Sequence, residues 1–354
     1  METTGIEHII ELLKNLIKIP SLSKQEEGTG DIIFDFLKNS GVEVNRVENN
    51  IWAHNRHFNP GKKTILLNSH HDTVKDGPGW TLDPFKPVIR NGKIFGLGSN
   101  DAGASLVCLI ETFLHYYNYK DLNYNLVILA SAEEEISGKN GIELALTEIG
   151  DIEFGIVGEP TSMEMAIAEK GLMVLDCVAK GTLGHAAREE GKNAIYIAAD
   201  DINWIRNYNF PKVSDTLGPV KMTVTLIEAG LQHNVVPDLC KFVIDVRSND
   251  YFSNIEILKI IKDNLLSDVN ARSTRLEPSG ISHDHILRKA AKNLGIKTFG
   301  SATLSDQALM AFPSVKIGPG DSSRSHTADE YVYVNEIKEG IKKYIKLINS
   351  FLVP

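Results

Sequence analysis

The sequence has few features of a secreted, membrane-bound or nucleic-acid-binding protein. Only three of its 354 residues are cysteines, and they lie in separate apolar segments (Cys108, Cys177 and Cys240), which argues against a disulfide framework or a cysteine-based zinc motif. No apolar run approaches the ~20 residues of a membrane span, and Met1–Gly5 do not begin a signal peptide. Lysine and arginine (37) are fewer than aspartate and glutamate (46), which disfavours nucleic acid or an anionic membrane as a partner. We therefore expect a soluble cytoplasmic protein.

Three widespread sequence signatures are also missing. No Gly-x-Ser-x-Gly segment is present, so the sequence offers no nucleophilic serine elbow. In the glycine-rich segment 96–103, Asp101 stands where a dinucleotide-binding motif needs its third glycine, and no lysine follows Gly103 as a phosphate-binding loop requires. The sequence therefore argues against serine-hydrolase and nucleotide-binding functions.

The length and the order of patterns predict two domains. Residues 1–169 repeat the order strand, polar cluster, helix, which is typical of an α/β domain with a mostly parallel sheet flanked by helices. Residues 170–277 contain longer strands and two helices, which indicates an inserted α+β domain with an antiparallel sheet. Residues 278–354 return to the first pattern and complete the first domain. Among the expected elements are a helix opened by a capping box of Ser23 and Glu26 and a last inserted strand at Ser273–Glu277.

The segment Thr64–Asp72 is the strongest local candidate for a functional site. An apolar strand ends in His70-His71-Asp72, and side-chain alternation places His70 and Asp72 on one face. Imidazole is a common ligand for zinc-like metals, and a nearby carboxylate often orients it. His71 should point to the opposite side and pack there.

Further acidic residues and one histidine follow other expected strands or loops of the same domain, namely Asp101, Glu134 with Glu135, Glu159 and His326. Because the carboxyl ends of parallel strands meet at one crevice, these side chains could lie together. Uncompensated carboxylates would repel one another there, and a pair of divalent metal ions would remove that repulsion.

Several nearby residues admit two interpretations. The run Glu133-Glu134-Glu135 leaves the register of a general base uncertain by one residue, although Glu133 fits a structural role better. Arg324, close to His326, is either a contact for an acyl or side-chain carboxylate or a solvated loop residue.

Taken in order, a series of short motifs resembles the dinuclear zinc hydrolase family of acetylornithine deacetylase, succinyl-diaminopimelate desuccinylase and the carboxypeptidase G type peptidases. The motifs are His70-x-Asp72, Asp101 after Gly-x-Gly, Glu134-Glu135, Gly158-Glu159-Pro160-Thr161-Ser162, Gly184-His185, Asn234-Val235-Val236-Pro237, Asp245-Val246-Arg247, Gly318-Pro319-Gly320 and His326-Thr-x-x-Glu330-Tyr331-Val332. The resemblance covers nearly the whole chain and is closest to the acetylornithine deacetylase branch. It departs from many relatives around Asp101, where Gly96-Leu97-Gly98 and Ala102-Gly103-Ala104 replace the common Gly-Arg-Gly and Met-Lys-Gly.

The resemblance implies a role for each motif residue. Asp101 would bridge two divalent ions, zinc in the first instance with cobalt or manganese as alternatives; His70 and Glu159 would bind one ion, and Glu135 and His326 the other. Asp72 would orient the His70 ring, Glu134 would be the general base, His185 would reach the substrate oxyanion, and Arg247 and Asn234 would hold the substrate α-carboxylate. The inserted domain would act as a lid and form a homodimer.

The resemblance also implies an activity on a small-molecule substrate. We expect an amidohydrolase that removes an acetyl or succinyl group from an N-acyl amino acid, such as N-acetylornithine or N-acetylcitrulline, in arginine biosynthesis. A dipeptidase, an aminoacylase or another deacylase of the same family is the alternative. A non-catalytic metal-binding relative is a further alternative, but the complete set of expected ligands and base argues against it.

Overall fold

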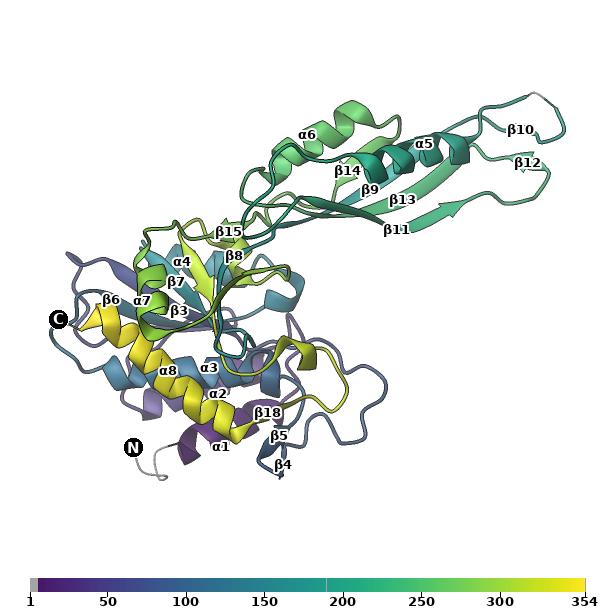
Figure 1. Cartoon of the computed structure of the whole chain (residues 1–354). Helices are drawn as coiled ribbons and strands as arrows, with labels where there is room; N and C mark the ends of the chain where they lie inside the picture. Colours follow the sequence, from purple (N-terminus) through teal and green to yellow (C-terminus); the bar gives the residue numbers. More distant parts are fainter. Residues whose placement is uncertain (1–5, 189, 354) are drawn as a thin grey trace. The chain divides into compact units, whose positions relative to one another are not determined.

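The computed structural model describes residues 6–188 and 190–353, which divide into two units (Figure 1). The first unit contains the described residues up to Ile167, together with Ile281–Phe299 and the residues from Ser305 onward. The second contains Ala168–Gly280 and Gly300–Leu304. Met1–Gly5, on which the signal-peptide prediction rests, lie outside the described residues. Within the described ranges, none of the helices combines the length and apolar character needed to cross a lipid bilayer.

The first unit is built on a mixed sheet with a parallel centre. Its strands follow one another in the order β1 (Asn45–Val47), β2 (Asn50–His54), β6 (Asn125–Ser131), β3 (Thr64–His70), β7 (Phe154–Val157), β17 (Ser314–Lys316) and β8 (Met165–Glu169). The four central strands β6, β3, β7 and β17 are parallel, whereas β1, β2 and β8 pair antiparallel. β8 also pairs with β15 (Ser279–Gly280) and β16 (Thr298–Ser301). This confirms the predicted α/β class.

Helices cover both faces of this sheet, so the central strands are buried along their whole length. Every residue of β3, β6 and β7 is buried, as expected for parallel strands inside an α/β fold. Alternate residues of β3 face opposite sides: Ile65 and Leu67 belong to one apolar cluster and Leu66 to another. The first cluster includes α1 (Glu7–Ile17), α2 (Glu27–Asn39), α3 (Ala104–Tyr116), α7 (Ile286–Leu294) and α8 (Val334–Leu352), and the second includes α4 (Ile142–Ile149).

A small three-stranded sheet connects two distant loops of the first unit. β4 (Val88–Arg90) and β5 (Lys93–Phe95) form the predicted hairpin, with Asn91 and Gly92 both at positive φ (53° and 71°), as a two-residue turn of this type requires. β18 (Tyr331–Tyr333) pairs with β5. The chain that precedes β18 is thereby brought to the loop that follows β5.

The second unit has a four-stranded antiparallel sheet in the order β11 (Lys221–Ala229), β13 (Leu239–Arg247), β9 (Leu172–Lys180) and β14 (Asp268–Ala271). α5 (Ala194–Asn207) and α6 (Asn254–Asn264) lie along one face of this sheet (Figure 1). Alternate residues of β9, among them Met173 and Leu175, are buried beneath these helices. A short ribbon of β10 (Gly184–His185) and β12 (Val235–Val236) extends from the unit. The prediction of an antiparallel sheet with two helices is confirmed.

Two local predictions are wrong, and three strands of the main sheet, β8, β15 and β16, were not predicted. The strand expected at Ser273–Glu277 is a loop, because its groups hold the start of α6: the Asn254 side chain donates to the carbonyl of Leu276, and the Glu277 carboxylate accepts from the Asn254 N–H. The edge strand is β14 instead. The capping box of Ser23 and Glu26 is absent as well, because α2 begins at Glu27 without a side-chain cap.

Candidate metal centre

The carboxyl ends of neighbouring parallel strands bring several of the predicted site residues together. His70 ends β3 and lies opposite Ser131, the last residue of β6. The chain after β6 turns immediately into a short helix, η3 (Glu134–Ile136), so both glutamates stand beside His70. β7, on the other side of β3, leads to Glu159.

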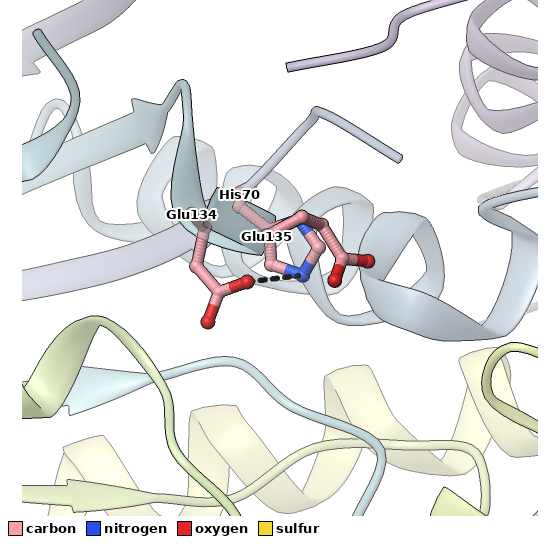
Figure 2. A group of neighbouring side chains, drawn as sticks. All are labelled: His70, Glu134 and Glu135. Atoms are coloured by element: carbon pink, nitrogen blue, oxygen red, sulfur yellow. Dashed lines mark ion pairs between the residues drawn. The ribbon is translucent and has the colours of Figure 1, made fainter. Parts of the chain in front are cut away.

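The His70 ring is surrounded by carboxylates. Its Nε2 atom lies 3.5 Å from Asp101 Oδ1 and 3.9 Å from one oxygen each of Glu134 and Glu159. Figure 2 shows the ring between Glu134 and Glu135. His70, Asp101 and Glu159 each offer a ligand atom within 4.8 Å of the others, which is close enough for one metal ion.

A second group of possible ligands shares Asp101 with the first. Nε2 of His326 lies 3.1 Å from Glu135 Oε2 and 3.5 Å from the second oxygen of Asp101, Oδ2. One ligand atom each of Asp101, Glu135 and His326 also lies within 4.8 Å of the others. The two oxygens of Asp101 thus face two different histidines, His70 and His326. One carboxylate lies between two potential metal positions.

Asp72 orients His70 and the two glutamates after β6 through hydrogen bonds. Nδ1 of His70 lies 3.0 Å from the Asp72 carbonyl oxygen and 3.4 Å from Asp72 Oδ1, which fixes the ring so that Nε2 faces the carboxylates. The Asp72 carboxylate also accepts hydrogen bonds from the backbone N–H groups of Glu134 and Glu135, both at 3.1 Å, and from the Ser23 hydroxyl at 2.7 Å. A single buried side chain therefore positions residues from two strand ends.

The electrostatics show that these acidic groups are crowded. Burial, together with the negative charges of Glu159, Asp306 and Glu135, raises the pKa of Glu134 well above its ordinary value, against the opposing effect of His70. The hydrogen bond that the His326 ring donates to the Glu135 carboxylate raises the pKa of His326 to about 9. A buried cluster of this kind favours added positive charge. Imidazole and carboxylate groups are ligands that zinc, cobalt and manganese accept, so the donor set fits divalent metal ions.

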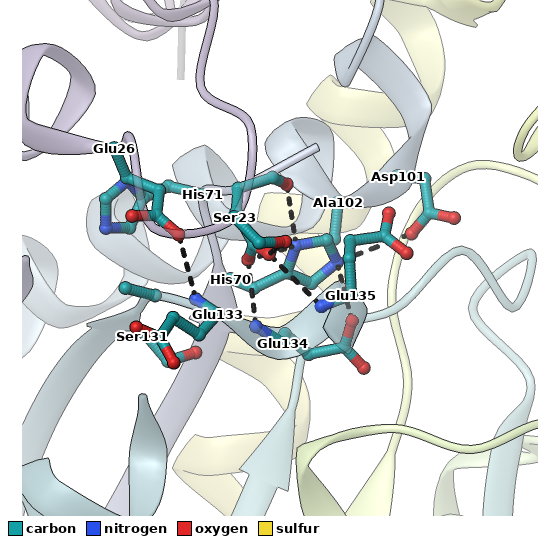
Figure 3. A network of polar contacts seen from close by, with 12 residues as sticks. Ser23, Glu26, His70, His71, Asp101, Ala102, Ser131, Glu133, Glu134 and Glu135 are labelled. Atoms are coloured by element: carbon teal, nitrogen blue, oxygen red, sulfur yellow. Dashed lines mark hydrogen bonds and ion pairs between the residues drawn. The ribbon is translucent and has the colours of Figure 1, made fainter. Parts of the chain in front are cut away.

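Glu133 does not join either group. Its backbone lies in the left-handed region (φ 56°), and its carboxylate accepts hydrogen bonds from the side chain and backbone N–H of Asn140. In Figure 3 its side chain lies apart from that of Glu134. His71 is also engaged away from the centre, with ring nitrogens 2.8 Å from Thr29 Oγ1 and 2.9 Å from the Asn49 carbonyl oxygen.

The predicted substrate residues lie in the second unit. His185 and Asn234 are neighbours in the β10–β12 ribbon, where the Ala186 N–H donates to the Asn234 carbonyl. Nδ1 of His185 accepts the Ala187 N–H at 3.1 Å, so a neutral His185 carries its proton on Nε2. Arg247 ends β13 and is held by Asp245, with Nε–Oδ1 2.8 Å and Nη2–Oδ2 3.1 Å.

Sequence reasoning missed the supporting roles of four buried or half-buried residues. Glu26 accepts the Glu133 N–H, and Ser23 donates to Asp72, so the residues taken for a capping box instead support the centre. Asp306 accepts hydrogen bonds from Asn68 and Ser131, and burial raises its pKa to about 6. Glu330 contacts the backbone of Asp101. No local signal in the sequence separates these residues from ordinary helix caps and loop acids. Only Glu330 belonged to one of the motifs that carry the family resemblance.

Comparison with known proteins identifies the family of the chain. The model described as Peptidase family M20/M25/M40 matches residues 66–350. The chain belongs to this family. It is therefore a hydrolase of the M20 group, and its candidate ligands all lie in the unit that carries the parallel sheet.

The relatives of this M20 hydrolase carry names of different activities. The chain is 27% identical over 377 residues to acetylornithine deacetylase of Buchnera aphidicola subsp. Schizaphis graminum, with 98% of each chain covered. It is 30% identical over 281 residues, 74% of each chain, to succinyl-diaminopimelate desuccinylase of Buchnera aphidicola subsp. Acyrthosiphon pisum (strain Tuc7). The crystal structure of aminopeptidase PepT from Bacillus cereus ATCC 10987 matches with a TM-score of 0.77 at 19% identity, covering 98% of each chain, which shows a shared fold.

Proposed function

We propose that this M20 hydrolase is a two-metal amidohydrolase that removes an acetyl or succinyl group from an N-acyl amino acid. The observation that carries the proposal is the position of Asp101, whose two carboxylate oxygens lie 3.5 Å from His70 and 3.5 Å from His326. A carboxylate between two histidine-containing groups suits a bridging ligand in a two-metal site.

The ligands would divide between two ions. His70, Asp101 and Glu159 would hold one, and Asp101, Glu135 and His326 would hold the other. Zinc is the first candidate, with cobalt or manganese as alternatives, because all three accept imidazole and carboxylate ligands. When bound, the metal pair would polarise the scissile carbonyl and make a water molecule acidic enough to ionise near neutral pH.

Glu134 is the general base in this proposal. Its carboxyl forms a third possible ligand group with His70 and Glu135, but the two groups that share Asp101 are complete without it. The backbone N–H of Glu134 donates to Asp72. It would take a proton from the attacking water and deliver it to the nitrogen of the leaving amine. Such transfer is efficient when the carboxyl pKa lies near the working pH, and burial raises the pKa of Glu134 in that direction.

Three residues of the second unit would recognise the substrate. His185 has an N–H at Nε2 in its neutral form, which suits donation to a developing oxyanion. Arg247 keeps its Nη1 group outside the pair with Asp245, and that group would bind the α-carboxylate together with Asn234. We further propose that residues 170–277 form a lid and homodimerisation domain.

N-Acetylornithine and N-acetylcitrulline are our preferred substrates, which would place the protein in arginine biosynthesis. The support is the acetylornithine deacetylase relative, which aligns over 98% of both chains. The desuccinylase relative supports a succinyl substrate. A dipeptidase or aminoacylase is the alternative, favoured by the fold shared with an aminopeptidase.

A substrate panel tests the proposal. The zinc-loaded protein would be offered N-acetylornithine, N-acetylcitrulline, their N-succinyl analogues and a set of dipeptides, with Glu134→Gln as the inactive control. We expect release of free ornithine or citrulline that depends on added metal. Rapid dipeptide cleavage without any deacylation would replace the proposal by the peptidase alternative, and no turnover at all would favour a non-catalytic relative.

A further inference from the structure

Asp101 occupies the central position of the proposed metal site, yet no strand carries it. It lies within η2 (Ser99–Gly103), where its own backbone departs from helical geometry (φ −115°, ψ 98°). Both of its carboxylate oxygens face histidines. A small rotation of this backbone would therefore disturb both groups of ligands, so the structure needs something that fixes it.

The side chain of Glu330 makes this connection. Its Oε1 atom accepts hydrogen bonds from the N–H groups of Asn100 (2.7 Å) and Asp101 (3.0 Å), and Oε2 accepts from the N–H of Gly98 (3.2 Å). Its own carbonyl oxygen accepts the Gly96 N–H. The residue is 2% exposed, so loss of this side chain would leave these buried backbone N–H groups without their acceptor.

The loop that contains Asp101 also forms hydrogen bonds to the loop that contains His326. The buried side chain of Asn100 accepts the Asp321 N–H at 3.0 Å and donates to the Asp321 carbonyl at 3.1 Å. It also lies 3.4 Å from the hydroxyl of Ser325, the residue before His326. Glu330 follows His326 by four residues. The two loops are thus cross-linked in both directions by one buried amide and one buried carboxylate.

We propose that Glu330 is a positioning residue for the metal site: it holds the Asp101 backbone so that both carboxylate oxygens face their histidines. This inference rests on the proposed function. It assigns Glu330 no contact with substrate or metal, and its effect is transmitted through Asp101. A purely structural buried acid would instead stabilise the fold without changing metal affinity.

Metal binding measured directly separates these two roles. Zn²⁺ would be titrated into the full-length metal-free protein against a competing chelator, for wild type, Glu330→Gln and Asp329→Asn. Glutamine keeps the size of the side chain but must turn an NH₂ group toward at least one backbone N–H. Asp329 is the matched control, because it also accepts two backbone N–H groups, those of Thr81 and Leu82, in the same loop.

We expect Glu330→Gln to bind Zn²⁺ about 10- to 100-fold more weakly, the range typical for residues that orient metal ligands. The Zn²⁺ affinity of Asp329→Asn should stay within about twofold of wild type, because Asp329 orients no metal ligand. Urea unfolding of the metal-free proteins, run in parallel, should show that Glu330→Gln is still folded. Glu330→Asp, which restores a carboxylate on a shorter side chain, should recover part of the affinity.

Other outcomes would overturn the inference. Unchanged Zn²⁺ affinity in Glu330→Gln would leave Glu330 as a structural residue only, and so would an equal loss in Asp329→Asn. If Glu330→Gln does not fold without metal, Glu330→Asp takes its place. Weaker Zn²⁺ binding than wild type then supports the inference, and unchanged binding overturns it. If wild type itself binds no Zn²⁺, the proposed function fails together with the inference, whereas tight binding by wild type and by Glu330→Gln contradicts the inference alone.

Discussion

Arg324 and Glu336 form a two-pronged ion pair, with Nη1–Oε2 2.7 Å and Nη2–Oε1 3.0 Å. The guanidinium also lies over the rings of Tyr331 (4.8 Å) and Tyr333 (5.3 Å). The sequence left open whether Arg324 meets a substrate carboxylate or is a solvated loop residue. The structure differs from both expectations, because both Nη groups of Arg324 donate to Glu336 within the protein.

Replacing Arg324 should therefore change stability more than substrate choice. Arg324→Gln would lose the pair with Glu336 and the aromatic contacts, and we expect a decrease of about 1–2 kcal/mol in the free energy of unfolding. The ratio of kcat/KM for N-acetyl and N-succinyl substrates should stay within about threefold, because a carboxylate-binding arginine would instead be worth more than a factor of ten. A selective collapse of succinyl turnover would show that Arg324 leaves Glu336 for substrate.

The three successive glutamates should respond differently to replacement by glutamine. Glu134→Gln should reduce kcat about 10²- to 10⁴-fold, the usual contribution of a general base, with bound metal retained. Glu135→Gln should lower the metal content, because Glu135 belongs with His326 and Asp101. Glu133→Gln should keep activity, since its carboxylate is turned to Asn140 and lies outside both groups of ligands. Metal analysis and kinetics on the same preparations check all three. An inactive Glu133→Gln would show that the general base is Glu133 and not Glu134.

Removal of metal should destabilise the first unit. Ligand binding at a free metal concentration 100 times Kd contributes about 2.7 kcal/mol to stability, and the carboxylates around His70 would lose their compensating charge. Adding a chelator during thermal unfolding should therefore lower Tm by several degrees. The His326→Ala variant should show a smaller decrease. An identical Tm with and without chelator would count against a resident metal.

His54 gives a test of pH dependence away from the metal centre. Burial lowers the pKa of this ring below the ordinary value of 6.5, and its buried Nδ1 atom has no hydrogen-bond partner among the described residues. The unfolded chain therefore takes up the proton first, so the stability due to neutral His54 is fully present above pH 6.5 and is lost as pH falls below it. Urea unfolding at about pH 7.5 and about pH 5.5, in chelator throughout, should show a smaller loss for His54→Phe than for wild type. Equal losses would contradict the assignment.

The proposed homodimer should depend on the edge strand β11. Leu226 and Ile227 are 64% and 59% exposed there, next to an irregularity in the pairing with β13, and an exposed apolar edge favours pairing with another chain. The double variant Leu226→Asp/Ile227→Asp should sediment as a monomer. Leu266→Asp is the control, because Leu266 is also exposed but follows α6. A monomeric wild type would refute the dimer directly.

The sequence was most informative where chemistry and periodicity coincide. The strand Thr64–His70 could be predicted because an apolar run that ends in polar residues is typical of a buried parallel strand, and the side chains after β3, β6 and β7 follow from parallel pairing. The centre's support could not be predicted. Ser23 and Glu26 match a helix cap by spacing alone, but the energy of their contacts with Asp72 and Glu133 depends on segments far away in sequence. The same is true of Asn254, which converts an expected strand into a loop.

The hydrogen bonds between the loops of Asp101 and His326 have a consequence for how the protein folds. Asn100 and Asp321 are 221 residues apart in sequence, and a Cβ atom at Gly320 would come within 2.4 Å of the Asn100 side chain. Contacts of such long range form late, because closing the intervening chain costs entropy before they can stabilise anything. We therefore expect metal uptake during refolding to lag behind the formation of secondary structure. Tight metal binding should appear only after the loops of Asp101 and His326 have come into contact.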